Sequence, residues 1–351
     1  MHYFTHKAAH ATPIIPLSPP LLASWLKQQD ARTRNWVKAQ SFNAEPATTL
    51  LVPSENGEIA CVLAGVEATI GTWSLAHVPA ALPAGSYALE AKWKPAQLAE
   101  AALGFALAQY QFGRYKPTKP KALTLQLPKA VDIAAIEAKR EAIALVRDLI
   151  NTPANDMGPA QLAKAAREVA KRTGARFSEI VGEDLLKKNY PAIHAVGRAA
   201  AQAPRLIELT HGKPSHPLVV LVGKGVTFDT GGLDIKPYAS MKLMKKDMGG
   251  AALVLGLAQL VIAAKLPIRL RVLIPAVENS VSGDAFRPQD VIHSRKGLTI
   301  EIGSTDAEGR LILADALTEG DSSKPALLID IATLTGAART ALAANGTSTR
   351  A

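Results

Sequence analysis

The chain has 351 residues, 48% of them hydrophobic, which suits a folded protein with two domains of ordinary size. Its single cysteine, Cys61, excludes an internal disulfide and a cysteine-rich zinc site, so a bound metal would need oxygen or nitrogen ligands. The formal net charge is +10, but the basic residues form only short runs, such as residues 116–121, without interleaved aromatic side chains, so a nucleic-acid partner is not expected.

The N-terminal part of the chain predicts a small α/β domain. From Ile14 to about Leu127, short β-type runs accompany one clear helix. Two of these runs, 48–52 and 58–63, flank a Ser-Glu-Asn-Gly turn signal and are expected to pair. Apolar residues at helical spacing predict a helix over residues 95–112. We place this domain at residues 1–130, where the sequence carries no visible chemistry.

A linker is predicted between this domain and the rest of the chain. It begins after a basic, proline-containing loop at 114–121 and contains an amphipathic helix at 132–150. A loop rich in helix-breaking residues follows at 151–159, and the next helix is expected to begin at Pro159. Residues 131–158 therefore form the linker helix and loop.

Beyond residue 159, helices and buried strands alternate, which predicts an α/β domain over 159–351. The expected architecture is a mixed, mainly parallel sheet flanked by helices. The expected strands are residues 193–196, 206–209, 218–222, 270–275 and 326–331. The expected helices are residues 159–173, 250–263 and 309–317. The last stretch, 343–351, is small and polar and predicts neither a helix nor a strand.

Two segments bear on the location of the protein. The apolar stretch 250–264 is shorter than a bilayer crossing and is flanked by polar residues, so a buried helix is expected there. Residues 1–25 lack a long apolar core followed by a small-residue cleavage pattern, which disfavours a secretory signal. We therefore expect a cytoplasmic protein without a membrane segment.

A glycine-rich segment follows the predicted strand 218–222 and reads GKGVTFDTGGLDIKP over residues 223–237. Glycines at such a point let the backbone pass close to a ligand. Neither the Walker spacing nor the dinucleotide fingerprint is present, so a nucleotide site is not expected.

Four carboxylates lie at the ends of elements in this otherwise apolar domain: Asp229, Asp247, Asp306 and Glu308. Taken alone, Asp247 could cap the helix that follows it, and the Asp306–Glu308 pair could be capping residues with a surface ion pair to Arg310. Four carboxylates converging in a dry site would repel each other unless cations neutralised them. Two divalent ions would do so, and oxygen ligands suit zinc, manganese or magnesium.

The segments that carry these carboxylates resemble those of the leucyl aminopeptidase (cytosol aminopeptidase) family, whose members remove N-terminal residues from peptides. The resemblance spans about Asn151 to Ala338 and rests on motifs in the family's order and spacing. These motifs are VGKGVTFDTGGLDIKP, MKKDMGGAA, SGDAFRPQDVI, STDAEGRL and DIATLTGA.

The resemblance implies a centre of two divalent ions, manganese or zinc, with roles for particular residues. One ion would be held by Lys224, Asp229, Asp247 and Glu308, and the other by Asp229, Asp306 and Glu308. Lys224 would coordinate as an unprotonated amine, with its pKa lowered by burial and by the adjacent ion.

Further roles follow from the same resemblance. Lys236 would stay cationic and stabilise the oxyanion of the tetrahedral intermediate, and Arg310 would position a bicarbonate that acts as general base. The substrate-binding residues would be Met244, Thr333, Leu334 and Gly336, each of which could equally be an ordinary packing or turn residue.

The implied function is a two-metal aminopeptidase that hydrolyses the N-terminal residue of peptides with a leucine-like preference, using a metal-bridging water. Members of the family continue well past the TLTGA turn and assemble as homo-hexamers, whereas this chain ends thirteen residues after Ala338. We therefore expect a C-terminally truncated member, for which hexamer assembly is an open expectation. The alternatives are an inactive fragment and a DNA-binding member of the family.

Overall fold

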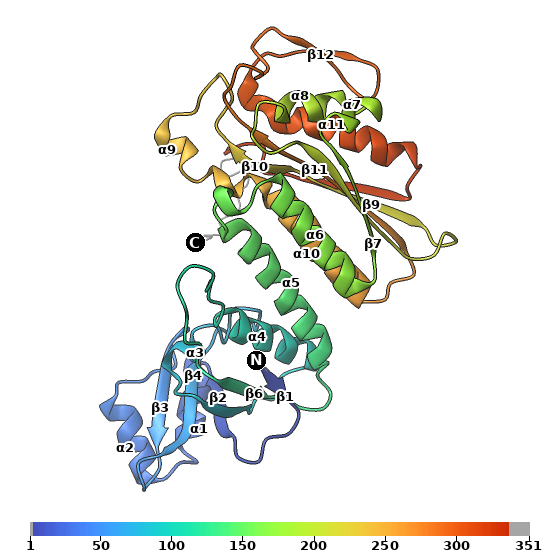
Figure 1. The fold of residues 1–351 in the computed structure, drawn as a ribbon. Coiled ribbons are helices and arrows are strands. Elements are labelled where there is room, and N and C mark those ends of the chain that lie inside the picture. The colour runs from blue at the N-terminus through green and yellow to red at the C-terminus, as the bar shows by residue number, and fades with distance from the viewer. Residues whose placement is uncertain (1–2, 337–351) are drawn as a thin grey trace. The chain divides into compact units, whose positions relative to one another are not determined.

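The computed structural model describes residues 3–336 (Figure 1). The chain divides into two compact units, the first ending at Ala144 and the second beginning at Leu145. Helix α5 (Ile133–Asn151) begins in the first unit and ends in the second. The polar tail 343–351 lies outside the described residues.

The first unit is built on a six-stranded sheet with the order β1-β6-β5-β2-β4-β3. All neighbouring strands are parallel except β3 and β4, which are antiparallel and joined by the predicted turn. The strands in sheet order are β1 (Phe4–Thr5), β6 (Leu123–Gln126), β5 (Gly85–Leu89), β2 (Thr12–Leu17), β4 (Ile59–Gly65) and β3 (Thr49–Pro53). The helices before α5 are α1 (Pro19–Leu26), α2 (Ala31–Ala39), α3 (Val78–Ala81) and α4 (Pro95–Leu107).

Both faces of this sheet are covered, because successive residues of a strand point to opposite sides. In β4, Val62 and Ala64 belong to the core beneath α3 and α4, whereas Cys61 and Leu63 belong to the core beneath α1 and α2. Residues 114–121 form no helix or strand, as predicted.

The second unit contains a five-stranded path with the order β14-β9-β11-β8-β7, and β10 also pairs with β11. The strands are β14 (Leu327–Ile331), β9 (Leu218–Gly223), β11 (Arg269–Asn279), β8 (Arg205–His211), β7 (Arg176–Val181) and β10 (Gly225–Asp229). The pairs β14–β9, β9–β11 and β10–β11 are parallel, and the pairs β11–β8 and β8–β7 are antiparallel. This arrangement confirms the predicted mixed, mainly parallel sheet.

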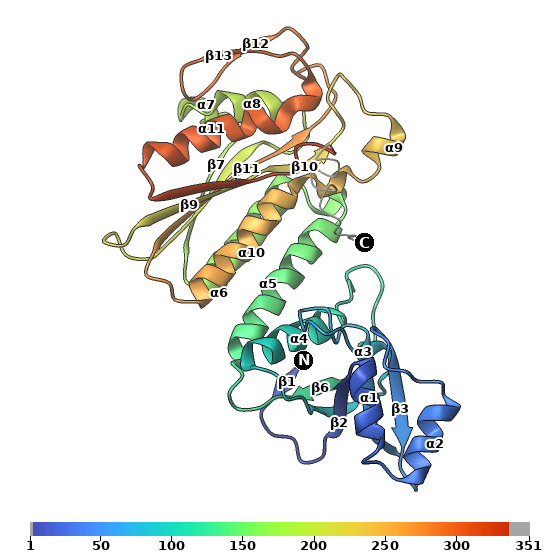
Figure 2. The ribbon, with the colours of Figure 1, turned by 180° about the vertical axis from the view of Figure 1, so that it is seen from behind.

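Helices cover both faces of this sheet (Figures 1 and 2). One core lies under α6 (Pro159–Thr173) and α10 (Gly249–Ala263), and a second lies under α8 (Pro191–Gly197) and α11 (Glu308–Ser322). The remaining elements are α7 (Asp184–Lys187), α9 (Tyr238–Met241), the hairpin of β12 (Val291–His293) and β13 (Thr299–Glu301), and three short 3₁₀ helices, η1 (Ala154–Asp156), η2 (Met244–Met248) and η3 (Thr305–Ala307).

Residues 244–263 form a helical segment long and apolar enough to cross a membrane, judged by length and composition alone. Most of it is buried in the fold, however, and Val254, Leu255 and Ala258 have no exposed surface. The prediction of a buried core helix in this stretch is confirmed.

The predicted strand at 193–196 is wrong, because these residues lie in α8. Pro191 opens the helix, and the fully buried Asp315 accepts hydrogen bonds from the backbone N–H groups of Ala192 and Ile193 at 2.8 and 3.2 Å. A carboxylate 123 residues away therefore caps a segment whose own β-branched residues favour a strand. Two further predictions differ at their ends, since α4 stops at Leu107 and α11 extends to Ser322.

The parallel strands bring several polar residues to one edge of the second sheet. Strands β9, β10, β11 and β14 run in the same direction, so their carboxyl ends lie at the same edge. Asp229 ends β10, Asn279 ends β11, Lys224 directly follows β9, and Thr333 follows β14.

Candidate metal centre

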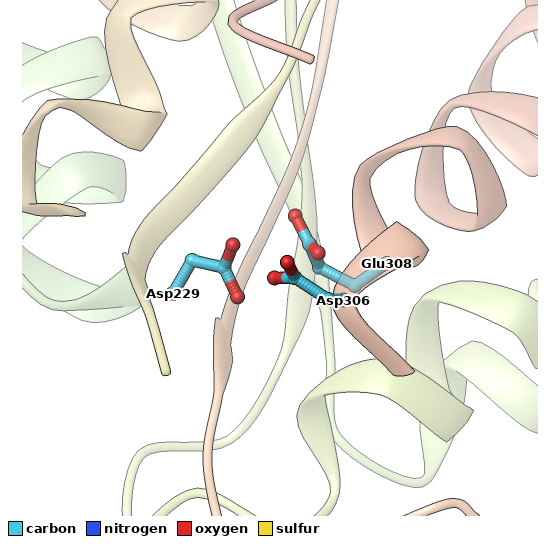
Figure 3. A group of neighbouring side chains, drawn as sticks. All are labelled: Asp229, Asp306 and Glu308. Atoms are coloured by element: carbon cyan, nitrogen blue, oxygen red, sulfur yellow. The ribbon is translucent and has the colours of Figure 1, made fainter. Parts of the chain in front are cut away.

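Three carboxylates converge at this edge, and Figure 3 shows their oxygens directed toward one another. Asp229 comes from β10, Asp306 from η3 and Glu308 from the first turn of α11. Each offers an oxygen within 4.8 Å of the others. Asp229 and Glu308 are buried, whereas Asp306 is exposed, so the cluster has one open side.

A second group shares Glu308 with the first. The amine of Lys224 lies 2.7 Å from Asp247 Oδ2 and 3.0 Å from Glu308 Oε1, and all three side chains are at most 3% exposed. Thr333, which follows β14, forms hydrogen bonds with two members of this group. Its hydroxyl donates to Asp247 Oδ1 at 2.8 Å, and its carbonyl accepts from the Lys224 amine at 3.1 Å.

Lys236 completes the cluster by forming ion pairs with Asp229, at 3.0 Å, and with Asp306. The loop that leads to it turns at Gly231 and Gly232, which have φ angles of +88° and +66°. A β-carbon at Gly231 would lie 2.5 Å from the carbonyl oxygen of Asp234, so only glycine fits. All five predicted metal ligands and Lys236 are thus brought together.

The charges of these six side chains do not balance. If all four carboxylates were ionised beside the two ammonium groups, the site would carry a formal charge of minus two although it is largely buried. Burial raises the pKa of Glu308, the ammonium of Lys224 lowers it, and the charges of Asp229 and Asp247 raise it, and together these effects bring it from 4.5 to about 7. A cation at this position would remove the excess of negative charge.

Burial acts to lower the pKa of Lys224, but the carboxylates of Glu308 and Asp247 outweigh it and hold the pKa above its usual value. The lowered pKa that the family resemblance implies for Lys224 applies when a divalent ion lies beside its amine. Among the described side chains alone, its two carboxylate partners favour the ammonium form.

The structure does not support the two simpler interpretations of these carboxylates, as helix caps or as a surface ion pair with Arg310. Asp247 lies inside η2 and makes no side-chain cap for α10, whose N-cap residue is Met248. Glu308 does not sit on an exposed loop: it is 1% exposed and pairs with Lys224, not with Arg310. The carboxylates therefore serve the cluster instead of the helix ends.

Models of two protein-family domains match this chain. A model of the cytosol aminopeptidase family, catalytic domain, matches residues 144–350, and a model of the M17 aminopeptidase N-terminal domain matches residues 12–128. The chain belongs to the cytosol aminopeptidase family. This result confirms the resemblance inferred from the motifs.

Individual family members are similar over much of the chain. A probable cytosol aminopeptidase from Syntrophotalea carbinolica is 43% identical over 256 residues, which cover 68% of this chain and 51% of that protein. The crystal structure of a cytosol aminopeptidase from Coxiella burnetii has 46% identity and a TM-score of 0.93, and the match covers 97% of this chain and 74% of that one. The bottromycin maturation enzyme BotP in complex with Mn has 33% identity and a TM-score of 0.82, covering 95% and 74%. The chain spans about half the length of the curated relatives it matches.

Among the other predicted site residues, Thr333 is the one for which the described part of the chain shows hydrogen bonds with the cluster. Met244 begins η2, and Thr333 contacts Asp247 and Lys224 as described. Leu334 is 47% exposed, and Gly336 is also exposed. Arg310 is exposed on α11, two residues after Glu308, and forms no ion pair with any residue in 3–336.

Three polar residues of the site were missed from the sequence: Asn279, Asp234 and Thr305. Asn279 has no exposed surface and donates to Asp229, and Thr305, also fully buried, exchanges hydrogen bonds with Asp234. The only sequence signal for Asn279 is its position just past a predicted buried strand, where parallel strands present ligands.

Proposed function

We propose that this chain carries the two-metal centre of an aminopeptidase that hydrolyses the N-terminal residue of peptides, with a leucine-like preference. The observation that carries the proposal is the sharing of Glu308 between two adjacent groups, one with Asp229 and Asp306 and one with Lys224 and Asp247. Membership of the cytosol aminopeptidase family and the manganese in the BotP structure support it.

The residues fit two divalent ions in number and chemistry. The first ion would be held by Lys224, Asp229, Asp247 and Glu308, and the second by Asp229, Asp306 and Glu308. Carboxylate oxygens and one amine are ligands that manganese and zinc accept, and the excess negative charge of the cluster favours cations. Such ions, when bound, lower the pKa of a water molecule and polarise a carbonyl group.

The other residues of the chain would bind and orient the substrate. The Lys236 side chain is 13% exposed and lies beside Asp229 and Asp306, from where its charge would stabilise a developing oxyanion. The exposed Arg310 would bind bicarbonate on the open side of the site. Met244, Thr333, Leu334 and Gly336 would surround the side chain and backbone of the N-terminal residue.

The proposed function includes a location, a substrate class and an assembly state. Relatives named cytosol aminopeptidases support a cytoplasmic location, and peptides would be its substrates. Assembly as a homo-hexamer remains part of the proposal for the complete family fold. A nucleic-acid function is not proposed, because the charged groups at the site are carboxylates paired with lysines instead of a basic surface.

The test is hydrolysis of a leucyl anilide by the purified chain with added manganese, alongside the variants Asp229→Ala and Glu308→Ala. Each variant removes a carboxylate proposed to contact both ions, so the rate is expected to fall by on the order of 100-fold or more. Glu301→Ala, on the exposed strand β13, is the control and should keep the wild-type rate. Equal rates in the wild type and both site variants would contradict the proposal.

A further inference from the structure

We infer that Asn279 is a positioning residue, which fixes Asp229 and the loop before α11 in the geometry that binds metal. The inference rests on the proposed function. It concerns a side chain that contacts a proposed ligand but would contact neither ion nor substrate.

The side-chain amide of Asn279 bridges two segments that carry proposed ligands. Its Nδ2 group donates to Asp229 Oδ1 at 2.9 Å and to the backbone carbonyl of Thr305 at 3.1 Å. Asp229 lies 50 residues before Asn279, and Thr305 lies 26 residues after it, directly next to Asp306. One fully buried amide therefore sets the distance between the end of β10 and the loop that bears Asp306.

The backbone of Asn279 also forms hydrogen bonds with Thr230, the residue after Asp229. Its carbonyl accepts hydrogen bonds from the N–H of Thr230 at 3.2 Å and from the Thr230 hydroxyl at 2.8 Å. Gly231 N–H adds a second bond to Asp229 Oδ1, at 2.9 Å. Asp229 Oδ1 is thus occupied by two neutral donors, and Oδ2 is the oxygen that faces the charged cluster through Lys236.

Thr305 forms hydrogen bonds with the loop that leads to Lys236. Its hydroxyl donates to the Gly231 carbonyl at 2.6 Å and accepts from Asp234 N–H at 2.8 Å, while its own N–H donates to Asp234 Oδ2 at 2.7 Å. The loops on either side of the site are therefore joined, and Asn279 connects them to β11.

The chemistry of an amide is required at this position. Both hydrogens of the Asn279 Nδ2 group meet acceptors, one a carboxylate and one a carbonyl, so rotation of the amide would place Oδ1 against two oxygens. A carboxylate of the same shape would repel Asp229. Hydrogen bonds of this kind orient metal ligands, and their loss typically weakens metal affinity 10- to 100-fold.

The experiment measures manganese binding by titration calorimetry for the wild type, Asn279→Ala and Asn279→Asp, with circular dichroism and thermal unfolding of the metal-free chains as folding checks. The control is Gln259→Leu, which removes another buried amide, on α10 and away from the site. We expect about 10- to 100-fold weaker binding in Asn279→Ala, a larger loss in Asn279→Asp and wild-type affinity in Gln259→Leu.

The outcomes separate this inference from the proposed function. Wild-type affinity in a folded Asn279→Ala variant would overturn the positioning role while leaving the metal centre in place. If Asn279→Asp does not fold, the alanine variant decides alone. An equal loss of affinity in Gln259→Leu would also overturn it, because the effect would then follow from losing any buried amide. If the wild type binds no manganese, the proposed function fails, and the positioning role fails with it.

Discussion

Replacement of Gly309 by alanine is expected to weaken metal binding strongly while the fold is retained. A β-carbon at this position would lie 2.4 Å from Cε and 2.7 Å from Nζ of Lys224. The Lys224 amine would have to leave its place between Asp247 and Glu308. The moving atoms are the end of a flexible side chain. Alanine also favours a helix over glycine by about 1 kcal/mol, which offsets part of the cost of separating Lys224 from its buried carboxylates.

The measurement is manganese affinity by calorimetry together with the thermal midpoint of the metal-free chain. Affinity should fall by on the order of 100-fold, since a proposed first-sphere ligand is displaced. Gly303→Ala is the matched control, because a β-carbon there meets nothing within 4 Å. Wild-type affinity in Gly309→Ala would show that the observed position of Lys224 is not needed for binding.

The second large effect is expected from Glu308→Gln, and it depends on pH. The pKa of Glu308 is raised from 4.5 to about 7, so the folded chain holds this proton more strongly than the unfolded chain does. The contribution of Glu308 to stability is therefore fully present below about pH 4.5 and is lost as the pH rises through 7. Glutamine does not titrate, so the variant should gain stability relative to the metal-free wild type over this window, by up to about 3 kcal/mol.

Denaturant unfolding in a chelator at several pH values measures this difference. Added manganese should reverse the comparison, since the wild type would gain about 2.7 kcal/mol at a ligand concentration one hundred times the Kd, whereas Glu308→Gln would gain little. Glu301→Gln on the exposed strand β13 should follow the wild type throughout. A stability difference that is constant from pH 4.5 to 8 would contradict the buried, shared position of Glu308.

Much of the fold could be predicted from the sequence, because local patterns there agree with the packing. The helix at 159–173 matches α6 at both ends, with Pro159 in its first turn and Gly174 at its C-cap. The buried strands β9 and β11 were found from their apolar runs. Segment 193–196 failed because its helix depends on Asp315, and no window of sequence contains that contact.

The candidate site was predicted unevenly, and for a physical reason. Charged residues close to glycines, such as Asp229 and Glu308, stand out in an apolar domain, and the family motifs contain them. Asn279 and Thr305 do not stand out, since a buried amide or hydroxyl is recognised by its hydrogen-bond partners, which come from other strands and loops. The ion pairs of Lys236 with Asp229 and Asp306 likewise appear only in three dimensions.

The most direct test of the account is a crystal structure of the chain soaked in manganese chloride, with anomalous scattering measured at the manganese edge. Two anomalous peaks are predicted, both adjacent to Asp229 and Glu308, with Asp247 and Lys224 beside one and Asp306 beside the other. Peaks at other surfaces alone, or a cluster that holds no manganese while Lys224 and Lys236 keep their ion pairs, would contradict the two-metal centre.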